Sequence, residues 1–420
     1  MTSAAPKTDI CVDVAIAGAG LIGGTLAVAL ARHGIKTAVI DRLDPAAMLE
    51  GSFDGRASAI TASSQTLLAA IGLWPHLADV AEPIREIRVS DGAAPLFLHY
   101  DHALLGDTPL GFMAENRHYR LAVARAMAEL PGHLTVVSGR AVTGMSDGPD
   151  QISLALDDGQ QVRARLAVAA EGRDSKLREL AGIGLTGWSY SQTAIVATIG
   201  HARPHDGIAH ERFLPAGPFA ILPLPDDRGV HRSSLVWTER TDAAPGYLAL
   251  DGTRFLAEIA ERVGGFLGEL SLIGPRFSYP LGLQFAARYG RGRMVLAGDA
   301  AHGIHPIAGQ GLNLGLRDVA ALTEIIADAH GLGLDLAHPE GLARYERWRR
   351  ADNLMMAGVT DVLNRLFSND IAPVRLARDL GLAAINRIVP LKKFFMRHAM
   401  GTVGDLPRLM RAPRTGTARG

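Results

Sequence analysis

Short apolar runs alternate with helical patterns at the start of the chain. Residues 10–17 form an apolar run rich in β-branched side chains, which predicts a buried strand. A helical pattern follows through Leu26 and Leu30 and stops at Gly34. Residues 36–40 predict a second strand. A strand, a helix and a second strand in this order are typical of an α/β domain.

The pattern becomes richer in strands further along. Runs bounded by Asp-Gly and Gly-Pro turn signals predict strands at residues 135–137, 152–156 and 161–170. Residues 189–279 are strand-rich, and around Pro280 the chain returns to the pattern of the first domain. We therefore predict an α/β domain assembled from separated segments, into which a second domain is inserted.

A stretch near residue 300 carries the clearest chemical signal. The apolar run 294–297 stops at Asp299, which places an aspartate at the carboxyl end of a buried strand, where open α/β sheets bind ligands. A helical pattern then opens on Gly309-Gln310-Gly311. Such a start presents bare N–H groups and the positive end of the helix dipole, which suit a phosphate or an electron-rich ring oxygen. A glycine turn without a ligand is the alternative interpretation.

A second glycine-rich turn follows the first predicted strand. Gly18, Gly20 and Gly23 form a GxGxxG motif between a strand and a helix, which lets a pyrophosphate approach the helix end. Asp41 lies 23 residues after Gly18, about where an acid that bonds a ribose hydroxyl is expected. The alternative for Asp41 is a solvated residue at the end of a strand.

Composition limits the class of protein. The chain has 420 residues, 48% of them hydrophobic, and a net charge of +0, so it is long enough for two domains and offers no global attraction to nucleic acid. Its single cysteine, Cys11, excludes an intrachain disulfide. The uncharged residues 14–31 contain four glycines, and we interpret them as a buried strand, turn and helix. We expect a cytoplasmic protein without a targeting segment.

The string Asp299-Ala-Ala-His302, followed by residues 305–318, HPIAGQGLNLGLRD, resembles the signature of the ubiquinone-biosynthesis hydroxylases. These are a branch of the single-component, FAD-dependent aromatic monooxygenases. The resemblance covers nearly the whole chain, and residues 406–420 are the least covered. It implies a Rossmann-like FAD-binding domain of the para-hydroxybenzoate hydroxylase type, with an inserted antiparallel-sheet substrate domain and C-terminal helices. The chain departs from most flavin hydroxylases at Glu171-Gly172, where they have Asp-Gly, and we expect a mainly structural role for Glu171.

The resemblance implies domain boundaries. The FAD-binding domain would comprise residues 1–75, 105–180 and 280–345. The substrate domain would comprise residues 76–104 and 181–279, and residues 346–420 would form a C-terminal helical region.

The same resemblance implies how FAD is held. The first glycine motif would take the ADP half, and Asp299 would take ribityl or phosphate oxygens. The backbone of Gln310, Gly311, Leu312 and Asn313 would face the N1/O2 edge of the flavin. Arg56 and Arg117 are candidate contacts to FAD phosphate, and Arg56 also to an incoming nicotinamide dinucleotide, because a guanidinium offers a planar set of donors. A surface salt bridge is the alternative for Arg56.

The implied reaction is reduction of the flavin by transiently docked NAD(P)H, capture of O2 as a flavin C4a-hydroperoxide and hydroxylation of a polyprenylphenol. The cofactor carries this chemistry. His305, Pro306 and Gly309 are the candidate catalytic residues, because they lie in the loop next to the flavin. His302 and His305 lack the other ligands of a metal site, and we expect none.

Two other functions stay open. Related folds include prenyl-chain reductases, so a flavin-dependent reductase or oxidase of an isoprenoid is one alternative. A non-catalytic prenyl-carrier or assembly subunit is the other, although the intact glycines and Asp299 argue against it.

The C-terminal tail combines basic and apolar residues. Residues 387–414 contain seven Lys and Arg residues against Asp405 alone, interleaved with apolar side chains such as Phe394 and Phe395. This pattern suits a peripheral helix on the inner face of an anionic membrane. A helix packed on its own protein is the alternative, as is one packed on a partner, and other ubiquinone-biosynthesis proteins in a complex are candidates.

Overall fold

The computed structural model describes residues 8–44, 55–92, 97–305, 309–367 and 387–411. The first eight-stranded sheet has the order β17-β18-β11-β1-β2-β8, with β10 and β9 added at β11. Strands β18, β11, β1, β2 and β8 are parallel. The strands are β1 (Ile10–Ala17), β2 (Thr37–Asp41), β8 (Leu134–Ser138), β9 (Val142–Asp147), β10 (Ile152–Leu156), β11 (Gln161–Ala169), β17 (Gly290–Arg291) and β18 (Met294–Leu296).

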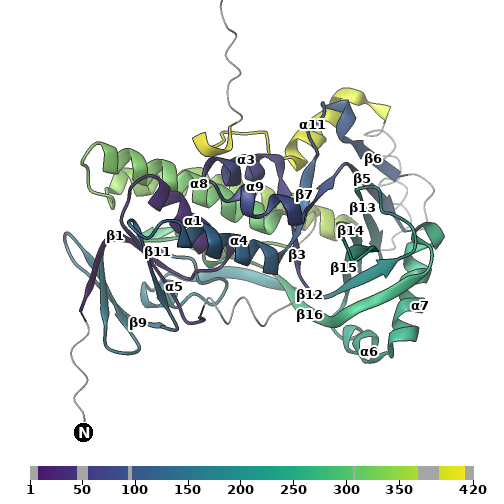
Figure 1. Ribbon diagram of the computed structural model, residues 1–420, viewed down its shortest axis with the longest axis horizontal. Helices are drawn as coiled ribbons and strands as arrows, with labels where there is room; N and C mark the ends of the chain where they lie inside the picture. Colours follow the sequence, from purple (N-terminus) through teal and green to yellow (C-terminus); the bar gives the residue numbers. More distant parts are fainter. Residues whose placement is uncertain (1–7, 45–54, 93–96, 306–308, 368–386, 412–420) are drawn as a thin grey trace, which may run out of the picture.

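Helices α1 (Leu21–Arg32), α4 (Asn116–Ala128) and α8 (Gln310–Gly331) lie together beside this sheet (Figure 1). Apolar side chains of the helices and strands form one large core, to which β1 contributes Val14 and Ile16 and α1 contributes Leu26 and Leu30, all fully buried. A strand that is buried on both faces has a nearly continuous run of apolar residues in its sequence. Strand β1 could therefore be predicted from the sequence.

The second eight-stranded sheet has the order β19-β16-β12-β15-β14-β13-β5-β6 and is largely antiparallel, with β13 and β5 paired in parallel. It lies to the right in Figure 1. Its strands are β5 (Glu86–Asp91), β6 (Phe97–Asp101), β12 (Leu185–His201), β13 (Ile208–Leu214), β14 (Gly217–Asp227), β15 (Val230–Arg240), β16 (Leu270–Ala286) and β19 (His302–Gly303).

One face of this second sheet is covered by α6 (Ala244–Ala249) and α7 (Gly252–Val263). Trp237 of β15 is fully buried there, with its ring 5.8 Å from that of Phe255. The opposite face turns toward a small three-stranded sheet, formed by β3 (Ala57–Thr61), β7 (Gly111–Glu115) and β4 (Ala81–Ile84).

The remaining helices are α3 (Ala62–Ala70), α5 (Lys176–Leu180), α9 (Pro339–Phe367) and α11 (Val389–Ala399). Helix α11 and most of α9 lie within the C-terminal helical region expected at residues 346–420. Strand β16 continues through residues 279 and 280, so the predicted boundary there falls within one strand.

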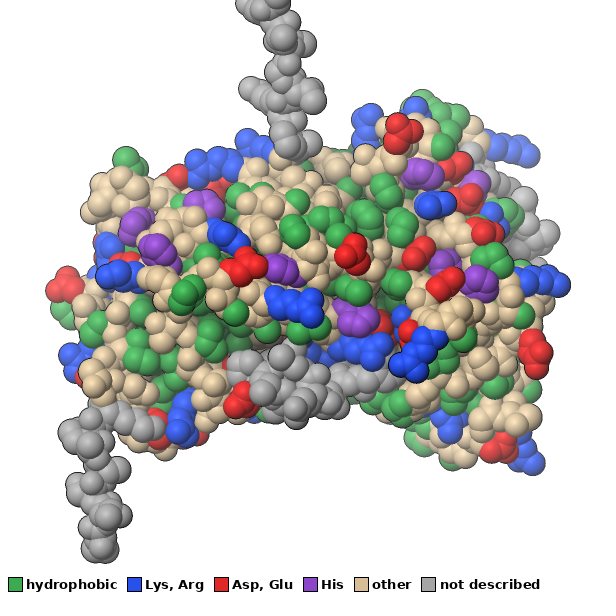
Figure 2. Space-filling view, in the orientation of Figure 1, with side chains coloured by type: hydrophobic (Ala, Val, Ile, Leu, Met, Phe, Trp, Pro, Cys, Tyr) green, Lys and Arg blue, Asp and Glu red, His purple; other side chains and the backbone are tan. Residues whose placement is uncertain are grey.

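Figure 2 shows basic, acidic and histidine side chains interspersed over one face, in keeping with the balanced composition. Among the described residues, no helix is both long enough and apolar enough to cross a membrane.

Candidate functional site

The GxGxxG motif forms the tight turn between β1 and α1. Gly18 has φ +97°, and a Cβ there would lie 2.5 Å from the carbonyl oxygen of Ala170. A Cβ on Gly23 would lie 1.9 Å from the carbonyl oxygen of Gly18. In contrast, a Cβ on Gly20 would meet nothing within 4 Å. A side chain at position 18 or 23 would therefore collide with the backbone, whereas Gly20 leaves open space at the start of helix α1.

Asp41 closes this turn from the end of β2. Its carboxylate accepts hydrogen bonds from the N–H of Ala19 at 2.6 Å and from that of Leu43 at 2.8 Å. The side chain therefore lies at the glycine turn, where the sequence analysis expected a ribose contact.

The two glycine-rich motifs lie at the same edge of the first sheet. Strands β1, β11 and β18 are parallel neighbours, so the turn after β1 and the Gly298–Ala300 turn after β18 meet at their carboxyl ends. The side chain of Ile22 joins them, because a Cβ on Gly298 would lie 3.0 Å from it and a Cβ on Gly315 would lie 2.6 Å from it. One extended ligand could therefore be held at both motifs.

Asp299 is available to such a ligand. Its side chain is 51% exposed, and the nearest cation is Arg173, with 3.8 Å between Nε and Oδ2. Glu171 has a different role, since it accepts hydrogen bonds from the N–H of Leu177 at 2.9 Å and from the hydroxyl of Ser175 at 2.8 Å. Glu171 thus supports the start of α5, in line with the structural role expected for it.

Helix α8 begins without a side-chain cap. Gly309 precedes it with φ +61° and provides no side-chain cap, and the first turn contains no acidic residue. A Cβ on Gly311 would meet nothing within 4 Å, whereas a Cβ on Gly309 would lie 3.0 Å from the Cβ of Ala59 in β3. The backbone at Gly311 is therefore open, and Gly309 packs closely against β3.

The side chain of Asn313 anchors this helix start. Its Oδ1 accepts from the Thr61 N–H at 2.9 Å and the Ser64 hydroxyl at 2.8 Å, and its Nδ2 donates to the Ala59 carbonyl at 2.8 Å. Asn313 thereby fixes the position of α8 against β3 and α3, and the flavin contact expected for its backbone stays a prediction.

The two candidate arginines differ in their surroundings. Arg117 forms an ion pair with Glu115 at 2.9 Å, although its own side chain is 41% exposed. Arg56 lies over the ring of Tyr279, at 5.1 Å from the centroid. Their predicted phosphate contacts stay predictions.

A buried ion network holds the turn after β18. Asp318 of α8 accepts from the Gly298 N–H at 2.9 Å, His302 Nε2 at 2.6 Å and Arg349 Nε at 2.7 Å. Arg349, on α9, also pairs with Asp352 at 2.6 Å. Burial alone would raise the pKa of Asp318, but His302 and Arg349 outweigh it and lower that pKa. The role of Arg349 was not predicted from the sequence, because a charged residue on a long helix is usually exposed to solvent.

His302 and His305 have separate environments. His302 is buried against Asp318, so a structural contact accounts for it. His305 is also buried, and burial lowers its pKa to about 4, although Asp361 opposes the shift. The His305 ring is therefore neutral near pH 7. Pro306, the residue after it, lies outside the described residues.

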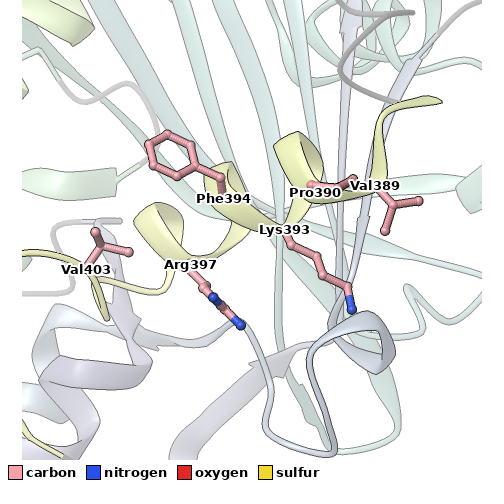
Figure 3. A pocket seen from close by; sticks show the side chains of 6 residues that line it. All are labelled: Val389, Pro390, Lys393, Phe394, Arg397 and Val403. Carbon is pink, nitrogen blue, oxygen red and sulfur yellow. The ribbon is translucent and has the colours of Figure 1, made fainter.

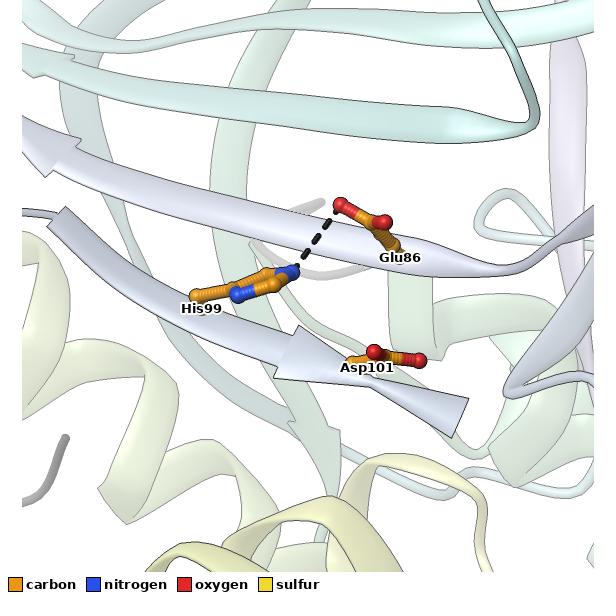
Figure 4. A group of neighbouring side chains, drawn as sticks. All are labelled: Glu86, His99 and Asp101. Atoms are coloured by element: carbon orange, nitrogen blue, oxygen red, sulfur yellow. Dashed lines mark hydrogen bonds and ion pairs between the residues drawn. The ribbon is translucent and has the colours of Figure 1, made fainter. Parts of the chain in front are cut away.

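Glu86, His99 and Asp101 form a cluster on β5 and β6 (Figure 4). The same oxygen of Glu86 already accepts from His99 at 2.9 Å and from Arg88 at 2.8 Å. Since a cation would have to displace Arg88, the cluster is explained as an ion-pair network.

The cradle at the two glycine turns fits FAD, because Gly20 and Gly311 leave open backbone at the starts of two helices that contact each other. Residues 11–356 match the family described as FAD binding domain. The solved structure of p-nitrophenol 4-monooxygenase PnpA from Pseudomonas putida has the same fold, with a TM-score of 0.80 and 20% identity, over 94% of this chain and 99% of that one. This is the fold of the FAD-dependent aromatic monooxygenases.

Two relatives define the family more narrowly. The ubiquinone hydroxylase UbiL of Rhodospirillum rubrum is 54% identical over 408 residues, which cover 96% of this chain and 94% of the relative. The 3-demethoxyubiquinol 3-hydroxylase of Escherichia coli is 34% identical over 391 residues, covering 93% and 98%. The chain belongs to the ubiquinone-biosynthesis hydroxylases and is an FAD-dependent aromatic monooxygenase. The resemblance and the cofactor predicted from the sequence are confirmed, and NAD(P)H is the usual co-substrate in this family.

The first prediction concerns flavin binding. Gly20→Val and Asp299→Ala should each yield folded protein with little bound flavin, because Gly20 borders open space and Asp299 is half exposed. Gly23→Ala is the contrasting variant and should lose stability, because its Cβ would collide with backbone. Flavin absorbance per protein and circular dichroism measure both properties. Full flavin occupancy in Gly20→Val or Asp299→Ala would mean that the cofactor is misplaced.

The second prediction concerns the buried network. Asp318→Asn should lower the free energy of unfolding by about 3–5 kcal/mol, because it removes the fully buried carboxylate that pairs with the buried Arg349 and accepts from His302, and Arg349 keeps only its pair with Asp352 among the described residues. Denaturant titration measures this loss. Since the pKa of Asp318 is lowered from 3.8, the difference from the parent should be full above pH 3.8 and shrink below it.

The control for this variant is Arg350→Gln. Arg350 is 42% exposed and pairs with Glu346 on the surface, so its loss should cost about 0.5 kcal/mol or less. Equal effects of the two substitutions would contradict the importance given to Asp318.

Proposed function

We propose that this monooxygenase hydroxylates the aromatic ring of a polyprenylphenol intermediate in ubiquinone biosynthesis, using NAD(P)H and O2. The names of the two relatives, a ubiquinone hydroxylase and a 3-demethoxyubiquinol 3-hydroxylase, support the substrate class. The bound FAD would take electrons from NAD(P)H and activate O2, and the residues of this chain would bind, orient and shield the reactants.

The observation that carries the proposal is a half-buried apolar wall on the second sheet. Ala220 and Val236 pair across central strands, and on the same face Val196 pairs with Phe277 of β16. Ala220, Val236 and Phe277 remain partly exposed although they lie within the sheet. Farther along this face, Leu222 belongs to a cluster with Ala59 of β3, which in turn adjoins Gly309. An aromatic ring lying on this wall would be close to the start of α8.

Within this proposal the predicted site residues have separate tasks. Gly18, Gly20, Gly23 and Asp41 would hold the ADP half of FAD, with help from Arg56 and Arg117. Asp299 and the backbone of residues 310–313 would hold the flavin end. His305, Pro306 and Gly309 would shape the space between flavin and substrate.

The third prediction tests this function. Purified protein, NAD(P)H and a short-chain prenylphenol should give a hydroxylated phenol whose new oxygen derives from 18O-labelled O2, as measured by mass spectrometry. Stoichiometric hydrogen peroxide with every prenylphenol tested would favour an oxidase instead. A reduced prenyl chain without oxygen incorporation would favour a reductase.

We also propose that α11 contacts an anionic membrane, from which a polyprenylphenol must be collected. Val389 and Phe394 of this helix are 49% and 51% exposed. They line a shallow groove together with Lys393 and Arg397 (Figure 3). Apolar side chains flanked by basic ones suit the surface of an anionic bilayer, and each engaged basic residue contributes about 1 kcal/mol.

Removal of the tail would be a poor test of this contact. Met396 of α11 is fully buried, and the carbonyl of Gly401 accepts from Arg317 at 2.9 Å, so the segment also stabilises the folded protein. Surface substitutions avoid this problem.

The fourth prediction therefore uses two double variants. Lys393→Gln with Arg397→Gln should weaken binding to phosphatidylglycerol vesicles about thirtyfold at low salt, as about 2 kcal/mol of attraction is lost. Val389→Ser with Phe394→Ser should weaken it at all salt concentrations. Leu332→Ser with Leu334→Ser is the control, since these residues are 74% and 46% exposed far from α11 in the sequence. Equal sedimentation of all variants, or no binding by the parent, would refute the proposal and leave a partner subunit as the occupant of this surface.

A further inference from the structure

The second half of helix α9 has an inverted distribution of polar and apolar residues. Four apolar side chains there are between 46% and 61% exposed: Leu354, Met355, Val359 and Val362. The side of the helix that packs against the protein is mostly polar, since Asn353, Thr360 and Asn364 are buried. A surface helix normally has its apolar residues inside and its polar residues outside. Exposed apolar residues grouped in this way are typical of a binding surface.

A gap lies in the middle of these apolar side chains. Gly358 is exposed, and a Cβ there would meet nothing within 4 Å. Residues four apart are neighbours on the surface of a helix, so Leu354 and Val362 border the gap on either side. We call residues 354, 355, 358, 359 and 362 the α9 face. Its gap gives room for an apolar chain to lie across the helix.

The same turns of α9 reach the candidate site on their inner side. Met356 and Ala357 belong to an apolar cluster with Ile304 and Leu314. Ile304 is the residue before His305, and Leu314 lies near the start of α8. The predicted flavin end of the site and the α9 face therefore lie on two sides of one cluster.

A row of rings makes a second connection. Trp188 of β12 is 44% exposed, and the guanidinium of Arg365 on α9 lies 5.9 Å from its ring centroid. The ring of Trp188 is 6.5 Å from that of Tyr190, which is 5.1 Å from the ring of His305. Arg365 also pairs with Asp361 at 2.9 Å, so its charge is compensated within α9. The rings lead from the surface beside the α9 face to the loop before α8.

The chemistry of the α9 face suits an uncharged, flexible and apolar ligand. Its residues carry no charge and no strong hydrogen-bonding group. The substrate class in the proposed function has such a part, the polyprenyl chain, attached to a ring that would lie near the start of α8. Both connections, through the apolar cluster and through the rings, run from that position to the α9 face.

We propose that the α9 face, together with Trp188, binds the polyprenyl chain of the substrate. This assignment rests on the proposed function, which supplies the substrate class. The chain covers apolar side chains that otherwise contact water, and its own apolar surface is covered in turn. Affinity therefore increases with the number of isoprene units until the face is filled.

The fifth prediction uses chain length as the variable. Phenols with one, two and three isoprene units are titrated into the oxidised holoenzyme, and binding is followed by the change in flavin absorbance. The parent should bind about fivefold more tightly for each added unit. Met355→Ser with Val362→Ser should reduce this gain to about twofold or less, because apolar contacts to the distal units are lost. The affinity for the one-unit phenol should not change.

Leu332→Ser with Leu334→Ser is the matched control. It removes exposed apolar side chains at another place on the surface, so it should keep the parent's dependence on chain length. All the replaced side chains are exposed, and circular dichroism and flavin content should therefore equal those of the parent. If Met355→Ser with Val362→Ser kept the full dependence on chain length, the α9 face would not be the site of the chain.

Two other occupants of the α9 face are tested with the same variants. Sedimentation velocity shows whether the parent is a dimer and whether Met355→Ser with Val362→Ser is a monomer. Such a result, with the dependence on chain length kept, would assign the face to a second copy and overturn the proposal. Loss of binding to phosphatidylglycerol vesicles, again with that dependence kept, would assign the face to a membrane and overturn it too.

Farnesol separates this inference from the proposed function, because it has a prenyl chain but no aromatic ring. Calorimetry should show that Met355→Ser with Val362→Ser binds farnesol about fivefold or more weakly than the parent does. This result would support the chain site even if the parent hydroxylated no prenylphenol, which would refute the proposed function alone. Equal farnesol affinity in an enzyme that hydroxylates prenylphenols would refute the chain site alone.

Discussion

The site depends on one buried carboxylate. Asp318 is fully buried and receives an N–H, an imidazole and a guanidinium from three different parts of the chain, the turn at Gly298, the residue His302 and helix α9. A carboxylate at this depth is tolerated only when it is paired and hydrogen-bonded. The network therefore ties the turn that carries Asp299 to helices α8 and α9.

Contact between the two glycine motifs follows from this arrangement. Helix α8, held by Asp318, presents Gly315 to the side chain of Ile22 on α1, and Gly298 touches the same side chain. A larger residue at Gly315 would push the helices apart. The two ends of the predicted FAD site are thus set by close packing of small residues, although they come from opposite ends of the chain.

Much of this could be predicted from the sequence because local patterns carry it. The apolar run 10–17 coincides with β1, and the helix expected to open at Gly309–Gly311 is α8. The partners of Asp318 could not be predicted in this way, since Arg349 lies on another helix and no local pattern distinguishes a buried arginine.

Helix α8 begins without a side-chain cap, and the charges around its start decide what could bind there. An uncapped helix start leaves N–H groups unsatisfied, which usually costs stability. Here the first turn contains no acid, the Asn313 side chain is bound to β3, and the nearby carboxylate of Asp318 is paired with Arg349 and hydrogen-bonded to His302. Among the described residues, no acidic side chain in the first turn therefore cancels the positive end of the helix dipole. A reduced flavin carries negative charge at its N1/O2 edge, so this field would stabilise the reduced cofactor at that edge.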